Sequence, residues 1–294
     1  MKILLIGSVI FSKFIFNELI KKNYNLVGVC TSKNKKNNSD FFNLSKIAKK
    51  NSVPCKFINN INSTNTFEWI KSKKPDLIIC CGWSQIIKKN ILKVPTYGCI
   101  GYHPSDLPRN RGRSPIIWTI FLGLKFCGST FFKMTEEADK GEILSKKKIK
   151  VYPNDDATII YKKLCLIGVK QIHISIKKVK TSKFKTNYKK NITSNFWRKR
   201  KFSDGKIDWR MSSTKIDKLV KALAEPYPNA HFIYKNKIVK VLKSKKIKHL
   251  SINIEPGKII LIKNKKIIVK CGEGAILLRK IFPNVKFKIN TYLD

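Results

Sequence analysis

Between residues 97 and 112 the sequence runs Tyr97-Gly98-Cys99-Ile100-Gly101-Tyr102-His103-Pro104-Ser105-Asp106-Leu107-Pro108-Arg109-Asn110-Arg111-Gly112. A short apolar run ends in a histidine, and a loop rich in Pro, Arg and Gly follows. In an open α/β sheet this pattern is typical of the carboxyl end of a strand, where such sheets bind ligands. Histidine is also the side chain best suited to proton transfer near neutral pH. The stretch therefore predicts a strand that carries a functional group at its carboxyl end.

The residues on either side alternate between strand and helix patterns. Strands are predicted at 3–6, 25–31, 54–58, 76–81, 98–103, 129–134 and 143–151. Helices are predicted at 11–22, 42–50, 66–72, 86–92, 115–122 and 156–176. Repeated βαβ units form a parallel sheet with helices packed against it. The first part of the chain is therefore expected to be a Rossmann-like α/β domain, with an open, mostly parallel sheet and helices on both faces.

The composition changes after the last of these helices. Residues 179–205 are rich in Lys, Ser, Thr and Asn, which is typical of a solvated basic linker. A helix is expected at 214–224, and short strands at 231–234, 237–242, 257–262, 265–271 and 275–282. Such closely spaced strands indicate a small β-barrel of the OB type. We therefore predict a catalytic domain at 1–178, a basic linker at 179–205, and a C-terminal helix and barrel domain at 206–294.

The net charge of +44 has two interpretations. A strongly basic chain can be a nucleic-acid binder. However, only seven of the 62 basic residues are Arg, and the Lys residues are scattered over nearly every segment beside abundant Asn and Ile. A general compositional preference for these residue types explains that pattern equally well, and we favour it.

Several functional classes are not expected from the motifs. The eight cysteines show no spacing typical of a metal site, and they are expected to be reduced. The first turn, Gly7-Ser8-Val9-Ile10-Phe11, has one glycine where a dinucleotide-binding turn needs three, so a nicotinamide cofactor is not expected. Neither a signal peptide nor an apolar run of membrane-spanning length is visible, so we expect a cytoplasmic protein without a membrane partner.

His103 has a candidate partner in Asp139, which lies in the segment Ala138-Asp139-Lys140-Gly141-Glu142 between two predicted strands. Neighbouring strands could bring both loops to one edge of the sheet. A carboxylate beside an imidazole raises the pKa of the imidazole and fixes its orientation. Such a pair can accept a proton from an attacking amine and later release it. Spacing alone leaves open the alternative of a surface histidine and an unrelated aspartate.

These residues carry a resemblance to a known family. Residues 98–112 and the following Ser114-Pro115-Ile116 resemble the N-x-H-x-S-L-L-P-x-x-R-G-x-x-P-I signature of formyltransferases that use N10-formyltetrahydrofolate. Residues 138–144 are similar to the L-D-T-G-D-M-L segment of that family. Ile207-Asp208-Trp209, residues 226–230 and residues 255–259 are similar to its I-D-W, P-Y-P-G-A and P-G-x-I segments. The resemblance covers almost the whole chain.

The resemblance implies transfer of a formyl group from N10-formyltetrahydrofolate to a primary amine, without a metal. His103 would contact the reacting centre and assist proton transfer, and Asp139 would hold and tune His103. The folate would lie against the backbone of one loop, Trp83-Ser84-Gln85-Ile86-Ile87. Candidates for the acceptor side are Tyr102, Ser105, Asp106, Arg111 and Gly112.

Two positions depart from the family signature. Gly101 stands where the signature has Asn, a residue thought to donate a hydrogen bond to the developing oxyanion. Losing one such donor in other enzymes costs ~10²–10³ in rate. We therefore expect that another group replaces it, such as a water or a backbone N–H, or that activity is weakened. Asp106 stands where the signature has its first Leu, and our hypothesis is that Asp106 or Tyr102 helps to select the acceptor.

Three functions remain open within this resemblance. The first is formylation of a nucleotide-linked amino sugar, which is favoured by the Gly-Tyr-His-Pro start and by Ser114-Pro115-Ile116-Ile117-Trp118. The second is formylation of initiator methionyl-tRNA, which is favoured by the net charge, by the basic loop Lys33-Asn34-Lys35-Lys36 and by the expected barrel. That loop is shorter than the basic insertion of the tRNA enzymes, and the signature Asn is absent. The third is a non-catalytic binding protein, supported only by Gly101. A homodimer is compatible with each of these.

Overall fold

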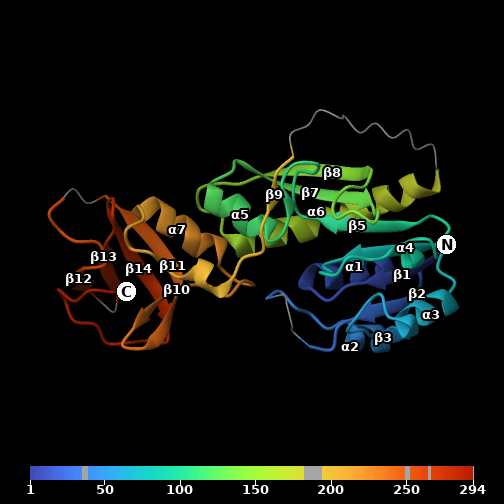
Figure 1. Ribbon diagram of the computed structural model, residues 1–294, viewed down its shortest axis with the longest axis horizontal. Helices are drawn as coiled ribbons and strands as arrows, with labels where there is room; N and C mark the ends of the chain where they lie inside the picture. The colour runs from blue at the N-terminus through green and yellow to red at the C-terminus, as the bar shows by residue number, and fades with distance from the viewer. Residues whose placement is uncertain (35–38, 182–193, 249–251, 264–265, 294) are drawn as a thin grey trace. The chain divides into compact units, whose positions relative to one another are not determined.

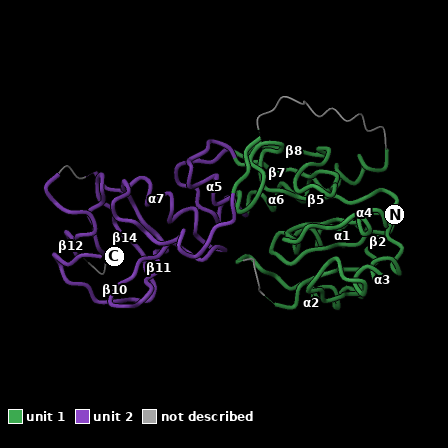
Figure 2. Tube along the Cα trace, viewed as in Figure 1, with its two compact units in different colours: residues 1–115, 127–149, 162–197 green, residues 116–126, 150–161, 198–294 purple. Residues whose placement is uncertain are grey.

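The computed structural model describes residues 1–34, 39–181, 194–248, 252–263 and 266–293. The chain forms two compact units (Figure 2). Unit 1 comprises residues 1–115, 127–149 and 162–197, and unit 2 comprises residues 116–126, 150–161 and 198–294. Much of the predicted linker, residues 182–193, lies outside the described residues, so the predicted domain limits stay a prediction.

A seven-stranded sheet forms the centre of unit 1, in the order β3-β2-β1-β4-β5-β7-β8 (Figure 1). Its strands are β1 (Lys2–Ile6), β2 (Asn25–Thr31), β3 (Cys55–Phe57), β4 (Leu77–Cys81), β5 (Cys99–His103), β7 (Phe126–Lys133) and β8 (Ile143–Lys150). The strands from β3 to β5 in this order are parallel, and β7 runs antiparallel to β5. The predicted mostly parallel, open sheet is therefore confirmed.

Helices cover both faces of this sheet, as predicted. They are α1 (Ile10–Lys21), α2 (Ser45–Lys50), α3 (Thr64–Ser72), α4 (Lys89–Leu92) and α6 (Ala157–Lys180). On one face, Phe11 of α1 stacks on Tyr102 of β5, with 3.9 Å between ring centroids. On the other face, Ile70 of α3 and Ile91 of α4 join a buried cluster that includes Cys99 of β5. Because side chains alternate along a strand, Gly101 and His103 share the face of Cys99, and Tyr102 lies on the opposite face.

The order of the strands places a ligand site at one edge of the sheet. The chain leaves β1 toward β2 on one side, and β4 pairs with β1 on the other side. Ligands of open α/β sheets bind outside the carboxyl ends of the strands at such a switch point. The loops that follow β1, β4 and β5 therefore meet at the edge where β5 ends in His103.

A short strand pair connects the loop after β5 to a distant segment. Strand β6 (Arg111–Gly112) pairs in parallel with β9 (Phe196–Trp197). Both strands belong to unit 1, although residues 196–197 fall within the predicted linker. This part of the predicted linker is therefore strand, because its backbone finds hydrogen-bonding partners in the loop after β5.

Unit 2 contains an antiparallel five-stranded sheet in the order β10-β11-β14-β13-β12. Its strands are β10 (Ala230–Tyr234), β11 (Lys237–Ile247), β12 (Ile259–Lys263), β13 (Lys266–Lys270) and β14 (Ala275–Phe282). The helical elements of this unit are η1 (Phe202–Gly205), α7 (Ser213–Ala222) and α5 (Pro115–Leu122), the last of these from residue 116 onward. The sequence predicted a helix followed by a small β-barrel domain of the OB type; the structure confirms a small C-terminal β domain after a helix, and its described strands form an antiparallel sheet. Across the part of the chain that the structure describes, none of the helices has the length and apolar character needed to cross a bilayer.

Candidate active site

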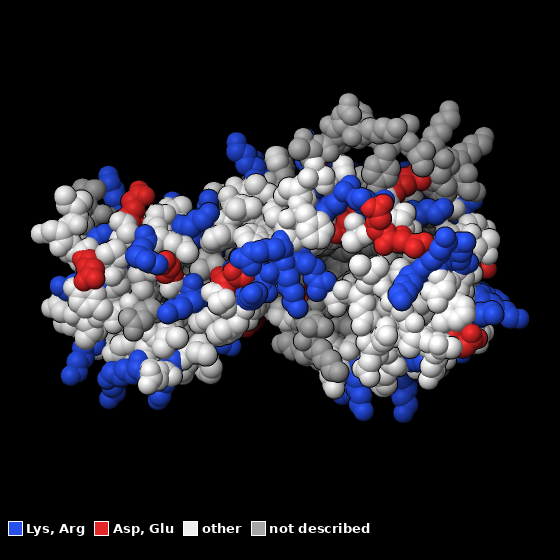
Figure 3. All heavy atoms as spheres, viewed as in Figure 1, with Lys and Arg blue, Asp and Glu red and all other residues white. Residues whose placement is uncertain are grey.

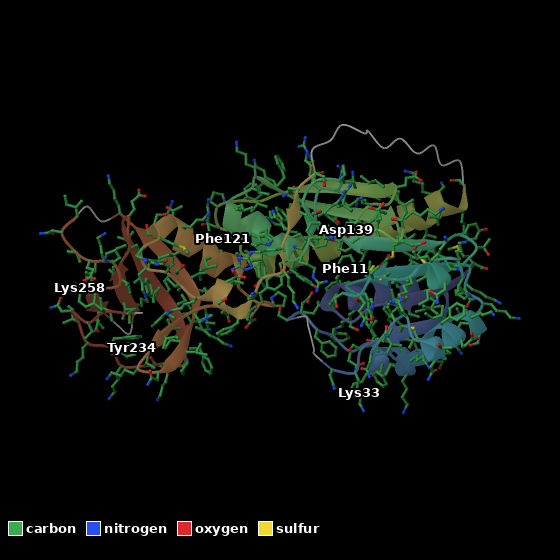
Figure 4. The ribbon with its side chains drawn as sticks, in the orientation of Figure 1. Phe11, Lys33, Phe121, Asp139, Tyr234 and Lys258 are labelled. Carbon is green, nitrogen blue, oxygen red and sulfur yellow. The ribbon has the colours of Figure 1, made fainter. Side chains whose placement is uncertain are left out.

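The structure brings His103 and Asp139 together. His103 is the last residue of β5, and 8% of its surface is exposed. Its Nδ1 atom lies 3.5 Å from Oδ1 of Asp139. Asp139 comes from the loop between β7 and β8. Figure 4 labels this residue. The two residues that the sequence singles out for proton transfer thus form a pair, and their roles remain a prediction.

Glycines set the position of Asp139. The N–H of Gly112 donates a hydrogen bond to Oδ2 of Asp139 at 3.2 Å. Gly112 has a φ of 96°, and a Cβ there would come within 2.3 Å of the carbonyl oxygen of Trp197. In the Asp139 loop, a Cβ at Gly141 would come within 1.5 Å of the carbonyl oxygen of Lys133. Both positions therefore require glycine if the carboxylate is to reach His103.

The surroundings of His103 favour its neutral form. Burial lowers the pKa of His103 below its ordinary value, because the charged imidazolium would lose its hydration. Asp139 and the backbone of Asn110 act in the opposite direction without reversing that shift. The Nε2 atom is buried and has no hydrogen-bond partner among the residues that the structure describes. The surroundings thus favour the neutral imidazole near pH 7, with a buried Nε2 that no described residue satisfies.

At Gly101 the structure gives a physical reason for the missing asparagine. Gly101 lies opposite Phe132 in the pairing of β5 with β7. A Cβ at Gly101 would come within 2.7 Å of Cζ of Phe132 and 2.9 Å of Cγ of Met134. The space that a side chain at this position would need is therefore filled by two apolar side chains. Since Gly101 also pairs with Cys80 of β4, its backbone lies in the interior of the sheet.

The predicted folate residues form one loop after β4. Gly82 has a φ of 67°, and a Cβ there would come within 2.0 Å of Val9 in the loop after β1. The indole N–H of Trp83 is buried and has no partner among the described residues. The carbonyl oxygen of Ser84 accepts a hydrogen bond of 3.0 Å from Nη1 of Arg113. A buried donor without a protein partner is a feature of a site that can receive a polar ligand group.

The rest of this loop is anchored to the segment before α3. The side chain of Gln85 accepts a hydrogen bond from the N–H of Ile61 and donates one to the carbonyl oxygen of Asn59, each at 2.8 Å. Ile87 is buried in the core. Ile86 is exposed, and its carbonyl oxygen accepts a hydrogen bond from Asn62. Gln85 and Ile87 therefore hold the loop in place, whereas Trp83 and Ser84 lie on the part of it that Arg113 connects to the loop after β5.

The side-chain hydroxyls of two predicted acceptor residues, Tyr102 and Ser105, have partners within the protein. Tyr102 lies on the other face of β5, where its hydroxyl bonds Ser129 at 3.1 Å. Ser105 is buried, and its hydroxyl donates to the carbonyl oxygen of Arg109, so it shapes the turn after His103. Arg111 lies in β6, and its Nε is buried without a partner among the described residues.

Asp106 is paired with two lysines of β8. Its carboxylate oxygens lie 2.8 Å from Nζ of Lys146 and 3.1 Å from Nζ of Lys148. Burial raises the pKa of Asp106, but the hydrogen bonds and charges of the two lysines outweigh burial and hold the pKa below its ordinary value. Any acceptor amine that approaches Asp106 would therefore compete with these ammonium groups.

Arg113 is the contact that sequence reasoning missed. Its guanidinium reaches back 29 positions to Ser84, and its own backbone N–H donates to the carbonyl oxygen of Trp197 at 2.9 Å. The signal was present in the sequence, because Arg113 directly follows the Arg111-Gly112 pair of the signature.

No group of His, Cys, Asp and Glu suited to a metal ion occurs within the described ranges.

The fold is shared with several solved structures. WlaRD, a sugar 3N-formyl transferase, superposes with a TM-score of 0.66 over 97% of this chain and 99% of its own, at 18% identity. An N-formyltransferase from Helicobacter canadensis gives a TM-score of 0.68 over 95% of this chain and 98% of its own, at 15% identity. HypX from Aquifex aeolicus gives 0.70 over 96% of this chain at 18% identity, and this chain spans only 44% of HypX. At these identities the likeness shows a common fold.

Sequence relatives and family models identify the family as well as the fold. A methionyl-tRNA formyltransferase from Caldanaerobacter subterraneus is 31% identical over 220 residues, which are 75% of this chain and 70% of that protein. One from Alkaliphilus oremlandii is 29% identical over 96% of this chain and 91% of that protein. The formyl transferase model matches residues 1–173, and the model of the formyl transferase C-terminal domain matches residues 199–292. The chain therefore belongs to the formyl transferase family and carries both of its domains.

Proposed function

We propose that this protein transfers a formyl group from N10-formyltetrahydrofolate to a primary amine. The proposal rests mainly on one observation, the buried His103 ring whose Nδ1 faces Asp139 and whose Nε2 has no partner among the described residues. An orphaned buried nitrogen is costly unless a bound group satisfies it. A substrate amine at this position would supply the missing partner and would place its proton within reach of a neutral base.

The loop after β4 fits the folate donor. Gly82 lets the start of this loop pack closely against Val9, and the buried indole N–H of Trp83, which has no partner among the described residues, offers a donor. When bound, the folate supplies the formyl carbon that the amine attacks. Residues 82–87 would bind and orient it, as the resemblance implies. Solved relatives of the fold support this choice, because WlaRD was solved with 5-N-formyl-THF and HypX with tetrahydrofolic acid.

His103 performs the proton handling in this proposal. Its neutral Nε2 accepts the proton that the amine loses as its nitrogen bonds to the formyl carbon, and Asp139 stabilises the resulting imidazolium. The bond from the formyl carbon to N10 of the folate then breaks, and the imidazolium returns the proton to N10 of the departing tetrahydrofolate. Until then the new Nε2–H is a charged hydrogen-bond donor at the position where Gly101 contributes none. In this way His103 could take over part of the role of the asparagine that Phe132 and Met134 exclude.

For the acceptor we favour the amino group of a nucleotide-linked sugar. Two proteins that share the fold over nearly their whole length are a sugar 3N-formyl transferase and an N-formyltransferase solved with dTDP-3-aminofucose. The sequence resemblance of residues 101–104 and 114–118 favours the same acceptor.

Initiator methionyl-tRNA is the second candidate. The relatives at 29–31% identity are methionyl-tRNA formyltransferases, and the net charge is +44. Lys and Arg side chains are spread widely over the face drawn in Figure 3. Lys35 and Lys36 of the basic loop lie outside the described residues.

A single assay separates these candidates. The purified protein is incubated with N10-formyltetrahydrofolate and, in parallel, with dTDP- and UDP-linked amino sugars and with charged initiator tRNA, and the formylated products are identified by mass spectrometry. We expect a formylated sugar nucleotide, whereas formylmethionyl-tRNA alone would establish the second candidate. A protein that binds folate but formylates none of these would favour a non-catalytic role. Unchanged turnover in His103→Ala would overturn the mechanism.

A further inference from the structure

Arg113 connects two parts of the site that come from different strands. Its side chain holds the carbonyl oxygen of Ser84, in the loop after β4. The residue before it, Gly112, holds the carboxylate of Asp139 through its backbone N–H. Consecutive residues of one segment thus contact the predicted donor loop and the partner of His103.

The backbone of this segment is itself fixed. The N–H of Arg113 donates to Trp197, and the N–H of Arg111 donates to the carbonyl oxygen of Asn195 at 3.1 Å. The N–H of Asn110 donates to Oδ1 of Asn195 at 2.9 Å. The side chain of Arg113 therefore extends from a backbone that is held at three places, and its guanidinium is oriented by the hydrogen bond to Ser84.

The donor loop is held from two sides. Gln85 anchors it to residues 59–61, on the side of α3. Arg113 anchors it to the segment that holds Asp139. The planar guanidinium suits this task, because its donors have a fixed geometry and its charge strengthens a hydrogen bond to a carbonyl.

We propose that Arg113 is a positioning residue for the formyl donor: by holding the carbonyl oxygen of Ser84, it fixes residues 82–87 in their binding conformation beside His103 and Asp139. The inference rests on the proposed function, because it assigns this loop to the folate. Without the contact, the loop must be ordered when the donor binds, and part of the binding free energy is lost in that ordering. The loss would fall on donor affinity rather than on the chemical step.

Substitution of the side chain tests this directly. Arg113→Met keeps the aliphatic stem and removes every donor, and Arg113→Lys restores the charge and one donor. Arg109→Met is the matched control, because Arg109 is exposed in the same loop and its loss removes the same charge. Binding of 5-formyltetrahydrofolate is measured by titration calorimetry. We expect Arg113→Met to weaken binding about 10- to 100-fold, Arg113→Lys to recover part of it, and Arg109→Met to stay within about twofold of the unsubstituted protein.

Kinetics and hydrogen exchange separate positioning from direct contact. In Arg113→Met the KM for the donor should rise, while kcat at saturating donor and the KM for the acceptor stay close to the original values. Without ligand, the amides of residues 83–87 should exchange faster in Arg113→Met than in Arg109→Met.

Three results would overturn the inference. Equal donor binding by Arg113→Met and the unsubstituted protein would show that the contact has no positioning role. Weaker binding with unchanged amide exchange would mean that Arg113 contacts the donor itself. If the unsubstituted protein binds no folate, the proposed function is wrong. The inference is then wrong as well, even if amide hydrogen exchange shows that Arg113 holds the loop. Thermal unfolding of each variant identifies any loss that comes from misfolding.

Discussion

Gly101→Asn restores the residue of the family signature, and the structure predicts that this chain will not tolerate it. The new Cβ would lie 2.7 Å from Cζ of Phe132 and 2.9 Å from Cγ of Met134, where ordinary contacts are about 3.5–4.0 Å. Phe132 is buried, so its ring would have to shift within the core to make room. The amide would therefore enter an occupied space in the interior of the sheet.

The expected cost follows from this overpacking. Forcing extra atoms into a packed core costs about 1–3 kcal/mol. At about 2–4 °C per kcal/mol for a unit of this size, the melting temperature should fall by roughly 2–12 °C. Thermal unfolding monitored by circular dichroism measures this fall, and the formyl-transfer assay measures activity in the same samples. We expect no gain in kcat, because the amide cannot reach the site without displacing its neighbours.

A second substitution makes the reasoning falsifiable. Gly101→Asn combined with Phe132→Ala should lose less stability than the sum of the two single changes, by about 1 kcal/mol or more, because the smaller residue vacates the space that the amide needs. Gly101→Ser, which places a smaller side chain in the same position, should show an intermediate loss. If Gly101→Asn alone melts at the original temperature and turns over faster, the proposed exclusion of the asparagine is wrong.

Three further predictions concern the charged residues. Because burial lowers the pKa of His103 from its ordinary value of 6.5, the midpoint of the acid limb of kcat/KM should lie below pH 6.5; a midpoint above 6.5 would contradict this. Asp139→Asn should lower kcat by about 10²-fold or more and shift that acid limb to lower pH, since the carboxylate raises the pKa of His103; an unshifted limb would show that the pair is not coupled. Asp106→Asn should lower the melting temperature at neutral pH by removing the carboxylate charge that pairs with Lys146 and Lys148. As the pKa of Asp106 lies below 3.8 in the folded protein, its contribution is present above 3.8 and lost as pH falls further; a difference from the unsubstituted protein that persists at acid pH would refute this origin.

The sheet of unit 1 could be predicted from the sequence because its strands are continuous apolar runs with helix patterns between them. A predicted helix boundary differs from the structure where a loop has a composition typical of helices. The predicted helix at 86–92 begins only at Lys89, because the side chain of Asn62 holds the backbone of Ile86 and Lys88. For example, the N–H of Lys88 donates to Oδ1 of Asn62 at 2.9 Å. Such a contact depends on tertiary structure and leaves no local pattern.

The candidate site divides in the same way. His103 and Asp139 could be predicted from the sequence, because His103 ends one predicted strand and Asp139 follows another, each within a recognisable motif. The crowding of a side chain at Gly101 by Phe132 and Met134 could not be predicted from the sequence, because it depends on the pairing of β5 with β7. Residues 194–197 fell within the predicted linker because the segment around them is rich in Lys, Ser, Thr and Asn and their partners lie about 85 positions earlier. Contacts of that sequence separation are visible only once the chain is folded.

The pairing of β6 with β9 also has a consequence for the order in which the molecule is made. A nascent chain that has emerged as far as residue 180 already contains the whole seven-stranded sheet, His103 and Asp139. The amides of Asn110, Arg111 and Arg113 still lack the acceptors that Asn195 and Trp197 provide. Contacts between distant segments form late, because chain closure must precede them. The protein is therefore expected to gain its fold before its active centre, which the ribosome completes only with residues that lie between the two family domains.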